Sequence, residues 1–372
     1  MSDDGRVELM KVQKICLPEQ DYVSWVVLDD DYLIVEPIAA FLSFCENIGR
    51  SPNAIRSSAH HLKLFWEFLR EKHVEWTEVD VAHLAAFVSW LRQENPVLLS
   101  LEQKPAARTD ATIDQMLTAV HSFYDFQMRM KTVPDLPLYR FLMMPNRRYK
   151  PFLYGIAKMK PVQSRVIKVK REQHRVKTLT QEQIQQTLDA CHHQRDRFLL
   201  SLLFDGGIRI GQALGLHHED IRPEDNEIEI VPRQHNTNGA RAKTRESYSV
   251  PVSPSLMQLY TDYLIDELSG LEVDALPDYV FVNLWEGEIG RPLTYATVRS
   301  LLRRIEKKTG IHVTAHMYRH SRATMWIRDD HLPLAMVSRL LGHASVSTTQ
   351  ATYVHLTAQD LRAVLEGKRG QA

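Results

Sequence analysis

The sequence of 372 residues carries no net formal charge, with 46 Lys and Arg against 46 Asp and Glu, and its length leaves room for two domains with a core each. No apolar run is long enough to span a bilayer, and the first residues lack the basic and apolar segments of a signal peptide, so we expect no membrane contact. Three cysteines that are far apart and odd in number argue against a disulfide framework and a zinc site, and they fit a cytoplasmic protein.

Charge is distributed unevenly along the chain. Residues 1–36 contain nine Asp and Glu against three Lys and Arg, whereas residues 147–177 contain eleven Lys and Arg against the single acid Glu172. Such a basic block can bind phosphate whatever the total charge is. The alternative is a solvated linker without a ligand, and the block alone does not decide between the two.

The first part of the chain is predicted to be an acidic segment followed by a helical domain. Residues 1–34 form the acidic segment, and DYVSWVVLDDDYLIVE (21–36) looks extended, with a turn at its three aspartates. Apolar residues at helical spacing then predict four helices, which carry Ile38 to Cys45, Ile55 to Leu69, Val81 to Leu91 and Ile113 to Tyr124. We expect these helices to form one all-α domain over residues 35–131.

Residues 132–177 break this helical pattern. They contain five prolines together with the basic block. Proline favours extended backbone and removes hydrogen-bond donors, so we predict a positively charged linker that follows an extended path.

Residues 178–372 predict a second domain of mixed type. A helix over Phe198 to Leu203 is interrupted by two glycines, and a new helix begins near Ile208. The alternation in NEIEIVP (226–232) and SYSVPV (247–252) predicts two strands joined by a long, polar, basic turn. Further helices are expected at 254–269, 294–309, 317–329 and 334–341. The fold class is therefore mainly α (α+β), with a small antiparallel sheet in the C-terminal mixed α/β domain.

Polar residues placed before apolar runs predict where several helices begin. In the first domain these are Asn53 and the pair Thr77 and Asp80. In the second domain the pairs are Thr180 with Gln183, Ser347 with Gln350, and Thr357 with Asp360.

Four features of the second domain could carry chemistry. His316 and Arg319 are three residues apart at a helix start, so both face the same way. His343 follows a glycine at a helix end, and Arg209 follows a double glycine, where the backbone allows close approach to a ligand. Lys243 lies in the turn between the two strands. Each feature alone is more often structural than functional.

Together these segments resemble the tyrosine recombinases and phage-type integrases. FDGGIRIGQALGLHHEDI looks like the family's arginine box, NGARAKTRESYSVPV like its basic hairpin, and HMYRHSRATMW with LLGHASVSTTQATYVH like its second box. The order of arginine box, lysine hairpin, HxxR, GH and tyrosine matches. The N-terminal helices are similar to the family's SAM-like core-binding domain, so the resemblance covers about residues 35–360.

The resemblance implies an enzyme that breaks and rejoins DNA in the integration, excision or transposition of a mobile element. A tyrosine would attack a phosphodiester, forming a 3′-phosphotyrosyl link and freeing a 5′-hydroxyl, so the bond energy is kept. Two planar, always charged guanidiniums would stabilise the extra negative charge of the transition state. Because they would replace a metal ion, we expect neither a metal nor another cofactor.

The resemblance also implies a role for each candidate residue. Arg209 and Arg319 would bind the phosphate, and Tyr353 would attack it. His316 would hydrogen-bond the phosphate or help to deprotonate Tyr353, and His343 would donate to a phosphate oxygen.

The leaving 5′-oxygen needs a proton, and Lys243 would supply it. Arg241 and Arg245 lie beside this lysine and are the alternatives. We favour Lys243 because its distance to Pro251 matches the family's hairpin lysine, and because lysine releases a proton readily.

Two positions depart from the family's pattern. Gln212 stands where the family usually has a glutamate that supports other site residues, which affects the local hydrogen bonding. Tyr353 lies ten residues after His343, where nine is also common, and one extra helical residue turns a side chain by about 100°. The alternative tyrosines nearby are Tyr248, Tyr295 and Tyr318.

The expected partner is double-stranded DNA, gripped from two sides by the two domains and held mainly through its phosphates. The candidate contacts are Arg147, Arg148, Lys150, Lys168, Lys170, Arg171, Arg233, Arg241 and Arg245. The resemblance further implies a homo-oligomer on DNA, a tetramer with two duplexes, in which a C-terminal helix near Leu361 to Leu365 docks on a neighbour. The alternatives are a type IB topoisomerase, which relaxes supercoils as a monomer, and a DNA-binding relative without catalysis.

Overall fold

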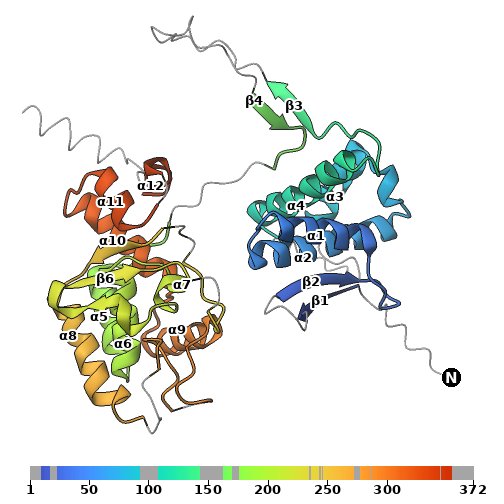
Figure 1. Ribbon diagram of the computed structural model, residues 1–372. Helices are drawn as coiled ribbons and strands as arrows, with labels where there is room; N and C mark the ends of the chain where they lie inside the picture. Colours follow the sequence, from blue (N-terminus) through green and yellow to red (C-terminus); the bar gives the residue numbers. More distant parts are fainter. Residues whose placement is uncertain are drawn as a thin grey trace, which may run out of the picture. The chain divides into compact units, whose positions relative to one another are not determined.

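The structure is a computed structural model that describes residues 10–16, 23–92, 108–142, 162–169, 176–233, 236–242, 244, 246–271, 277–285, 287–343 and 345–353. The chain divides into two compact units, Met1–Gln173 and His174–Ala372. They are the blue to green and the yellow-green to red parts of Figure 1. No helix in the described ranges is long and apolar enough to cross a membrane.

The first unit is built around the predicted helices. They are α1 (Glu36–Asn47), α2 (Pro52–Glu71), α3 (Val81–Arg92) and α4 (Asp110–Arg129), with a 3₁₀ turn η1 (Trp76–Glu78) between α2 and α3. Aromatic rings fill the core: Phe65 of α2 contacts Phe87 of α3 and Tyr124 of α4, and all three are buried. Such interlocking rings remove large apolar areas from water, which holds the four helices together.

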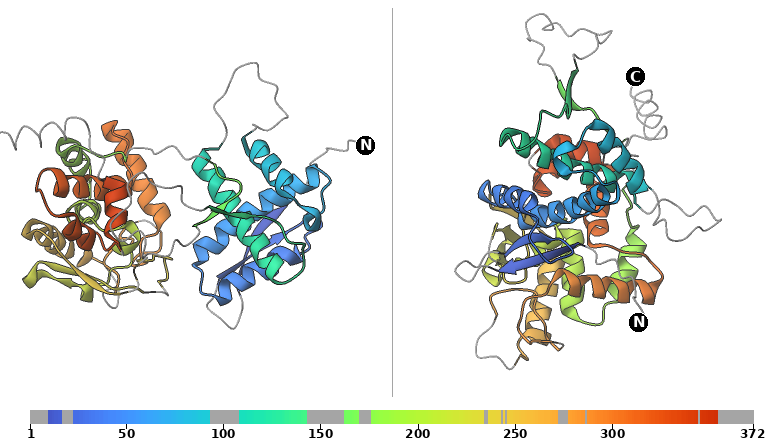
Figure 2. Two further views of the ribbon diagram at one scale, coloured as in Figure 1. Left: turned by 90° about the horizontal axis from the view of Figure 1, so that it is seen from above. Right: turned by 90° about the vertical axis from the view of Figure 1, so that its right-hand side faces the viewer.

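A hairpin that the sequence did not fully predict packs on these helices. Strands β1 (Lys11–Cys16) and β2 (Val23–Leu28) pair antiparallel and lie against α1 and α2 (Figures 1 and 2). Val27 of β2 is completely buried in the helical core. The described part of the acidic segment therefore belongs to the core of the first unit. The predicted aspartate turn is present, since the Asp29 carboxylate accepts the N–H of Leu33 at 2.8 Å.

The region predicted as a linker contains a second antiparallel hairpin, β3 (Tyr139–Leu142) and β4 (Val162–Arg165). The guanidinium of Arg165 donates to the Thr118 hydroxyl at 2.8 Å and lies 3.7 Å from the Asp114 carboxylate, both on α4. The described part of the predicted linker thus contains two short strands that pair antiparallel, and this hairpin is bound to the first unit.

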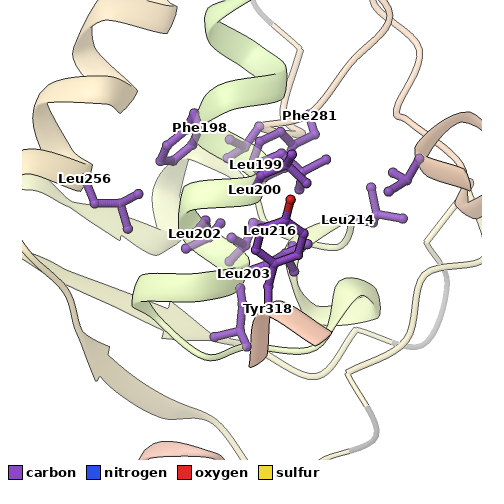
Figure 3. Packing of buried hydrophobic residues seen from close by; sticks show 14 of the residues in the cluster. Phe198, Leu199, Leu200, Leu202, Leu203, Leu214, Leu216, Leu256, Phe281 and Tyr318 are labelled. Carbon is purple, nitrogen blue, oxygen red and sulfur yellow. The ribbon is translucent and has the colours of Figure 1, made fainter. Parts of the chain in front are cut away.

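The second unit surrounds one buried helix, α6 (Gln194–Asp205). The other helices are α5 (Gln181–Asp189), α7 (Ile210–Ala213), α8 (Pro254–Tyr263), α9 (Tyr295–Thr309), α10 (Ala315–Arg328), α11 (Leu334–Leu340) and α12 (Val346–Tyr353), with short turns η2 (His218–Asp220), η3 (Pro223–Asp225) and η4 (Leu264–Leu268). Figure 3 shows Leu199 and Leu203 of α6 packed beside Tyr318 of α10. The buried Tyr318 hydroxyl donates to Thr187 at 2.8 Å, so this tyrosine is a core residue.

The two predicted strands are β6 (Glu227–Ile230) and β7 (Tyr248–Pro251), and they form a small antiparallel sheet with a third strand that was not predicted, β5 (Ile221–Arg222), in the order β5-β6-β7. Ile228 and Val250 pair across β6 and β7 and are both fully buried, as the alternation predicted. The fold is therefore mainly helical with small antiparallel sheets, as expected.

Helix starts in the first unit differ from the prediction in detail. The Ser51 hydroxyl accepts the N–H of Ala54, so Ser51 caps α2 and the prediction for Asn53 is wrong. At α3 the Asp80 carboxylate accepts the N–H of His83 at 2.8 Å, whereas the proposed partner Thr77 lies in η1. Polar residues one or two positions apart compete for the same N–H groups, and sequence alone does not choose between them.

Helix starts in the second unit also agree only in part with the prediction. The capping box of Thr180 and Gln183 is present at α5. The predicted cap at Ser347 is wrong, because α12 begins at Val346 and the Ser345 hydroxyl accepts the N–H of Ser347 at 3.2 Å. The helix expected at 254–269 is α8 followed by the π-helical turn η4. The pair Thr357 and Asp360 and the helix near Leu361 to Leu365 lie outside the described residues.

Candidate active site

The site is formed where the loop before α7 meets α10 and the turn between α11 and α12. Gly207, the second residue of the double glycine, has a φ of +57°, and a Cβ there would lie 2.9 Å from the Trp326 ring of α10. Only glycine tolerates both the left-handed backbone and this close approach. The sequence thus brings Arg209, two residues later, close to α10.

Arg319 is the buried anchor of the site, with 3% of its surface exposed. Its Nη1 donates to the carbonyl of Gly207 at 2.7 Å, and its Nη2 donates to the carbonyl of Leu341 at 2.8 Å. Burial, and then repulsion by Arg209, lower the pKa of Arg319 to about 10, so the guanidinium is still charged at neutral pH. One side chain therefore holds together the three segments that form the site.

Arg209 lies at the N-cap of α7, and one nitrogen of its guanidinium has no hydrogen-bond acceptor. Its backbone N–H donates to the Gln212 side-chain oxygen at 2.8 Å, which fixes the start of the helix. Its Nη1 is buried and has no hydrogen-bond partner. An unpaired buried donor costs about 1–3 kcal/mol, and an anion would remove that cost. Two neighbouring guanidiniums with a free donor are chemically suited to bind an anion such as a phosphate.

His343 supports Arg319 in this structure. Its Nε2 lies 3.0 Å from Nη2 of Arg319, and because arginine can only donate, Nε2 accepts. Nδ1 then carries the proton and donates to the Thr349 hydroxyl at 2.8 Å. Burial, followed by Arg319 and Arg209, lowers the pKa of His343 to about 4, so the ring is neutral at neutral pH.

Tyr353 reaches this site from the end of α12. It is 7% exposed and packs with Trp326, Val337 and Leu341 in a small apolar cluster. Burial raises the pKa of Tyr353, while Arg319 and Arg209 act in the opposite direction. The positive charges of Arg319 and Arg209, which belong to the same chain, therefore act on the pKa of Tyr353.

The hydroxyl of Tyr353 lies 2.8 Å from Nδ1 of His320, a residue that the sequence reasoning missed. The predicted His316 is exposed on the preceding turn of α10, and its ring centroid is 5.9 Å from that of His320. The signal was available: His320 follows His316 by four residues and therefore lies on the same helix face.

The alternative tyrosines occupy other environments. Tyr318 lies in the core, and Tyr295 is 39% exposed at the start of α9. Tyr248 of β7 borders the site: its hydroxyl accepts from the Gln212 amide at 3.0 Å, and a Cβ on Gly342 would lie 2.5 Å from it. Gln212, which stands where the family's pattern usually has a glutamate, thus contacts both Arg209 and Tyr248.

Lys243, the proposed general acid, lies outside the described residues. The same is true of six predicted DNA contacts, which are Arg147, Arg148, Lys150, Lys170, Arg171 and Arg245. The basic turn before Lys243 does reach the site. A Cβ on Gly211 of α7 would lie 2.4 Å from the backbone carbonyl of Arg241, so the turn passes directly over the arginine box. Gly211 allows this contact because it has no side chain.

The other predicted phosphate contacts differ in their freedom to bind. Lys168 is exposed. Arg233 is not free, because its two terminal nitrogens donate to the Asp220 carboxylate at 2.7 and 2.8 Å and one also donates to Glu219. These partners raise the pKa of Arg233. Arg233 therefore holds the loop before β5 together in this structure.

A basic face on α9 was also missed. Arg299, Arg303 and Lys307 are exposed and four residues apart, opposite a buried face formed by Val298, Leu301, Leu302 and Ile305. Residues four apart on a helix share a face, so the spacing in the sequence could have revealed this patch. Among the described residues there is no group of three or more His, Cys, Asp or Glu that could hold a metal ion.

Comparison with known proteins identifies the family. Residues 177–360 match the phage integrase family, and residues 38–131 match the N-terminal SAM-like domain of phage integrases. Transposase A from transposon Tn554 of Staphylococcus aureus is 40% identical over 354 residues, which cover 95% of this chain and 96% of the transposase. This chain belongs to the phage integrase family.

Two further proteins are similar to this chain at lower identity. Tyrosine recombinase XerC from Chlamydia caviae is 24% identical over 341 residues, covering 87% of this chain and 95% of XerC. The Tn1549 transposon integrase, solved in complex with a circular intermediate DNA, has the same fold with a TM-score of 0.61 at 13% identity, covering 89% of this chain and 98% of that chain. This phage integrase family member is therefore a tyrosine recombinase, an enzyme that breaks and rejoins DNA.

Proposed function

We propose that this tyrosine recombinase cuts and rejoins double-stranded DNA at specific sites through a covalent link between Tyr353 and a 3′-phosphate. The reaction would serve the movement of a mobile element, as the name of the Tn554 transposase suggests for that relative. One observation carries the proposal: the Tyr353 hydroxyl lies in one largely buried site with Arg209, Arg319 and the neutral ring of His343.

The proposed chemistry follows from the charges of this site. A phosphodiester bound by Arg319 and Arg209 gains negative charge as the tyrosine oxygen attacks, and fixed guanidiniums stabilise that charge without reorganisation. The free Nη1 of Arg209 gives one such donor. His343 would turn from Arg319 to a phosphate oxygen, which requires a proton on Nε2 that the resting structure does not place there.

The 5′-oxygen leaves as the tyrosine bonds to phosphorus, and Lys243 remains our candidate for its proton. The contact between Arg241 and Gly211 supports this choice, because it leads the basic turn past the arginine box two residues before Lys243. No step here passes through a metal ion or another cofactor.

DNA would be held by cations on several elements. We propose Lys168, Arg241 and the exposed face of α9 as phosphate contacts, in addition to the predicted basic residues outside the described ranges. Assembly into a tetramer on two duplexes, with the C-terminal helix docked on a neighbour, is part of the same proposal. The enzyme would then work on chromosomal DNA in the nucleoid.

A nicked duplex from the DNA that flanks the coding sequence tests the central step, because the nick traps the covalent product. Wild-type protein should form an adduct that resists denaturation, and Tyr353→Phe should bind the duplex equally well and form none. Tyr295→Phe, which changes a tyrosine that is 39% exposed, is the matched control and should keep the adduct. An adduct from Tyr353→Phe would refute the proposed nucleophile. Relaxation of a supercoiled plasmid without any such site would instead favour the topoisomerase alternative.

A further inference from the structure

His320 is the side chain that hydrogen-bonds the proposed nucleophile. Its Nδ1 lies 2.8 Å from the Tyr353 hydroxyl, and the two ring centroids are 5.4 Å apart. We propose that His320 accepts the proton of Tyr353 while the tyrosine oxygen attacks phosphorus. The inference rests on the proposed function, which assigns the attack to Tyr353.

The environment of Tyr353 explains why an acceptor is needed. Burial raises the pKa of Tyr353 above the usual value near 10, and the opposing effects of Arg319 and Arg209 do not cancel this rise. The hydroxyl therefore keeps its proton at neutral pH until the new bond begins to form. A positioned acceptor within hydrogen-bond distance is then required.

The other groups around the hydroxyl are less suited to this task. Arg319 has only donors. His343 has both ring nitrogens engaged, one with Arg319 and one with Thr349. His316 is exposed on the preceding helical turn. His320 alone among these residues presents a ring nitrogen to the Tyr353 hydroxyl at hydrogen-bond distance.

The protonation state of His320 fits an acceptor. Burial, then His316 and Arg319, lower the pKa of His320 to about 4, so its ring is neutral at neutral pH and a lone pair is available. A DNA phosphate bound by Arg319 would offset part of this positive charge. The basicity of His320 would then rise at the moment when substrate is present.

The step balances as follows. The bond from the Tyr353 oxygen to phosphorus forms, the bond from phosphorus to the 5′-oxygen breaks, and the phenolic proton moves to Nδ1 of His320. A separate acid, Lys243 in our proposal, protonates the 5′-oxygen. In rejoining, the 5′-hydroxyl attacks phosphorus, and His320 returns its proton to the departing tyrosine oxygen.

Two variants separate proton transfer from positioning. His320→Ala removes the acceptor, whereas His320→Asn keeps a hydrogen-bond acceptor near the place of Nδ1 but cannot take the proton. Both should slow adduct formation on the nicked flanking duplex by about 10²- to 10⁴-fold, the usual size of a general-base effect. His312→Ala, which changes an exposed histidine of the same unit, is the control and should react at the wild-type rate. Recovery of the rate by His320→Asn would reduce His320 to a positioning residue and overturn the inference.

A duplex with sulfur in place of the bridging 5′-oxygen tells which end of the reaction His320 serves. Sulfur leaves without protonation, so it relieves the loss of an acid at the leaving group but not the loss of a base at the nucleophile. The sulfur substrate should not restore the rate of either His320 variant. Restoration would place His320 at the leaving group and contradict the proposal.

Nitrogen NMR of ¹⁵N-histidine in the DNA-free protein provides a readout that does not depend on cleavage. We expect an unprotonated, hydrogen-bonded Nδ1 on His320 whose resonance shifts in Tyr353→Phe, and a protonated Nδ1 would refute the inference. Wild-type adduct formation with an unimpaired His320→Ala overturns this inference alone. An adduct from Tyr353→Phe overturns the proposed function as well.

Discussion

At the scale of single residues, Gln212 shows how a departure from the family's pattern is accommodated. Its side-chain oxygen accepts the N–H of Arg209, and its amide donates to the Tyr248 hydroxyl. Gln212→Ala leaves both partners unsatisfied in a buried place, and we expect a loss of about 1–3 kcal/mol in the free energy of unfolding together with slower cleavage. Gln212→Glu keeps the acceptor for Arg209 and lets Tyr248 donate instead, so it should remain close to wild type. Urea denaturation of both variants checks this, and equal losses would contradict it.

His121 predicts an acid-sensitive first unit. It is 1% exposed and neither ring nitrogen has a hydrogen-bond partner. Burial, and then Arg165, lower the pKa of His121 to about 4, so the unfolded chain binds the proton first as pH falls. Stability is complete above about pH 6.5 and decreases by about 3 kcal/mol on the way to about pH 4. His121→Leu should flatten this part of the stability profile measured by urea denaturation, and an unchanged pH dependence would refute the assignment.

The residues of the site were predictable to different degrees. Arg209, Arg319 and Tyr353 were predicted from the family resemblance, because each stands in a segment whose local sequence is similar to one of the family's boxes. The partner of the Tyr353 hydroxyl did not follow, since His316 and His320 share one helix face and only the packing of α12 places His320 at the hydroxyl. A pattern of residue types identifies a helix face but not which turn of it meets another element.

At the scale of elements, α12 is held in place by two hydrogen bonds on one face. Thr349 and Tyr353 are four residues apart, so the bond from His343 to the Thr349 hydroxyl fixes the helical turn that precedes Tyr353. This arrangement brings the Tyr353 hydroxyl to His320 despite the spacing of ten residues from His343. α12 begins at Val346, two positions before the first helical residue that a cap at Ser347 predicted.

Removing the bond from His343 to Thr349 should displace Tyr353, our proposed nucleophile, without unfolding the second unit. Thr349→Val keeps the shape of a completely buried side chain but leaves Nδ1 of His343 without its acceptor. We expect adduct formation to fall about tenfold, which corresponds to about 1.4 kcal/mol, with DNA binding unchanged. Thr348→Val, on the exposed side of the same helix, is the control and should react normally. A wild-type rate for Thr349→Val would mean that the apolar cluster alone positions α12.

At the scale of the whole molecule, composition was a poor guide to the partner. The chain has no net charge, yet its cations are concentrated in the linker, the basic turn and α9. The division into helical and mixed units followed from periodicity, because each unit buries its own apolar face. The strand β1 was missed because its alternation is short and it is stabilised by pairing with β2, a contact that local sequence does not reveal.

The cations of α9 lead to a prediction about salt. Each phosphate contact releases condensed counterions, so the logarithm of the affinity falls with the logarithm of salt concentration by about 0.9 per contact. Arg299→Ala and Arg303→Ala should each make this slope shallower by about 1 on a duplex of arbitrary sequence, as measured by fluorescence anisotropy between low and moderate salt. Both side chains are exposed, so neither change should destabilise the fold.

Arg233→Ala is the informative contrast, because it also removes one positive charge from a predicted DNA contact. Its guanidinium is bound to the Asp220 carboxylate, which is 3% exposed and would be left buried without a cation, with the backbone N–H of His217 at 2.8 Å still donating to it. We expect a loss of about 3 kcal/mol in the free energy of unfolding and an unchanged salt slope. A slope that changes with Arg233 and not with Arg299 or Arg303 would contradict the proposed DNA-binding face on α9 and favour the loop before β5. Each of the three variants removes one positive charge. The expected salt slopes differ because Arg233 is already bound to the Asp220 carboxylate, whereas Arg299 and Arg303 are exposed.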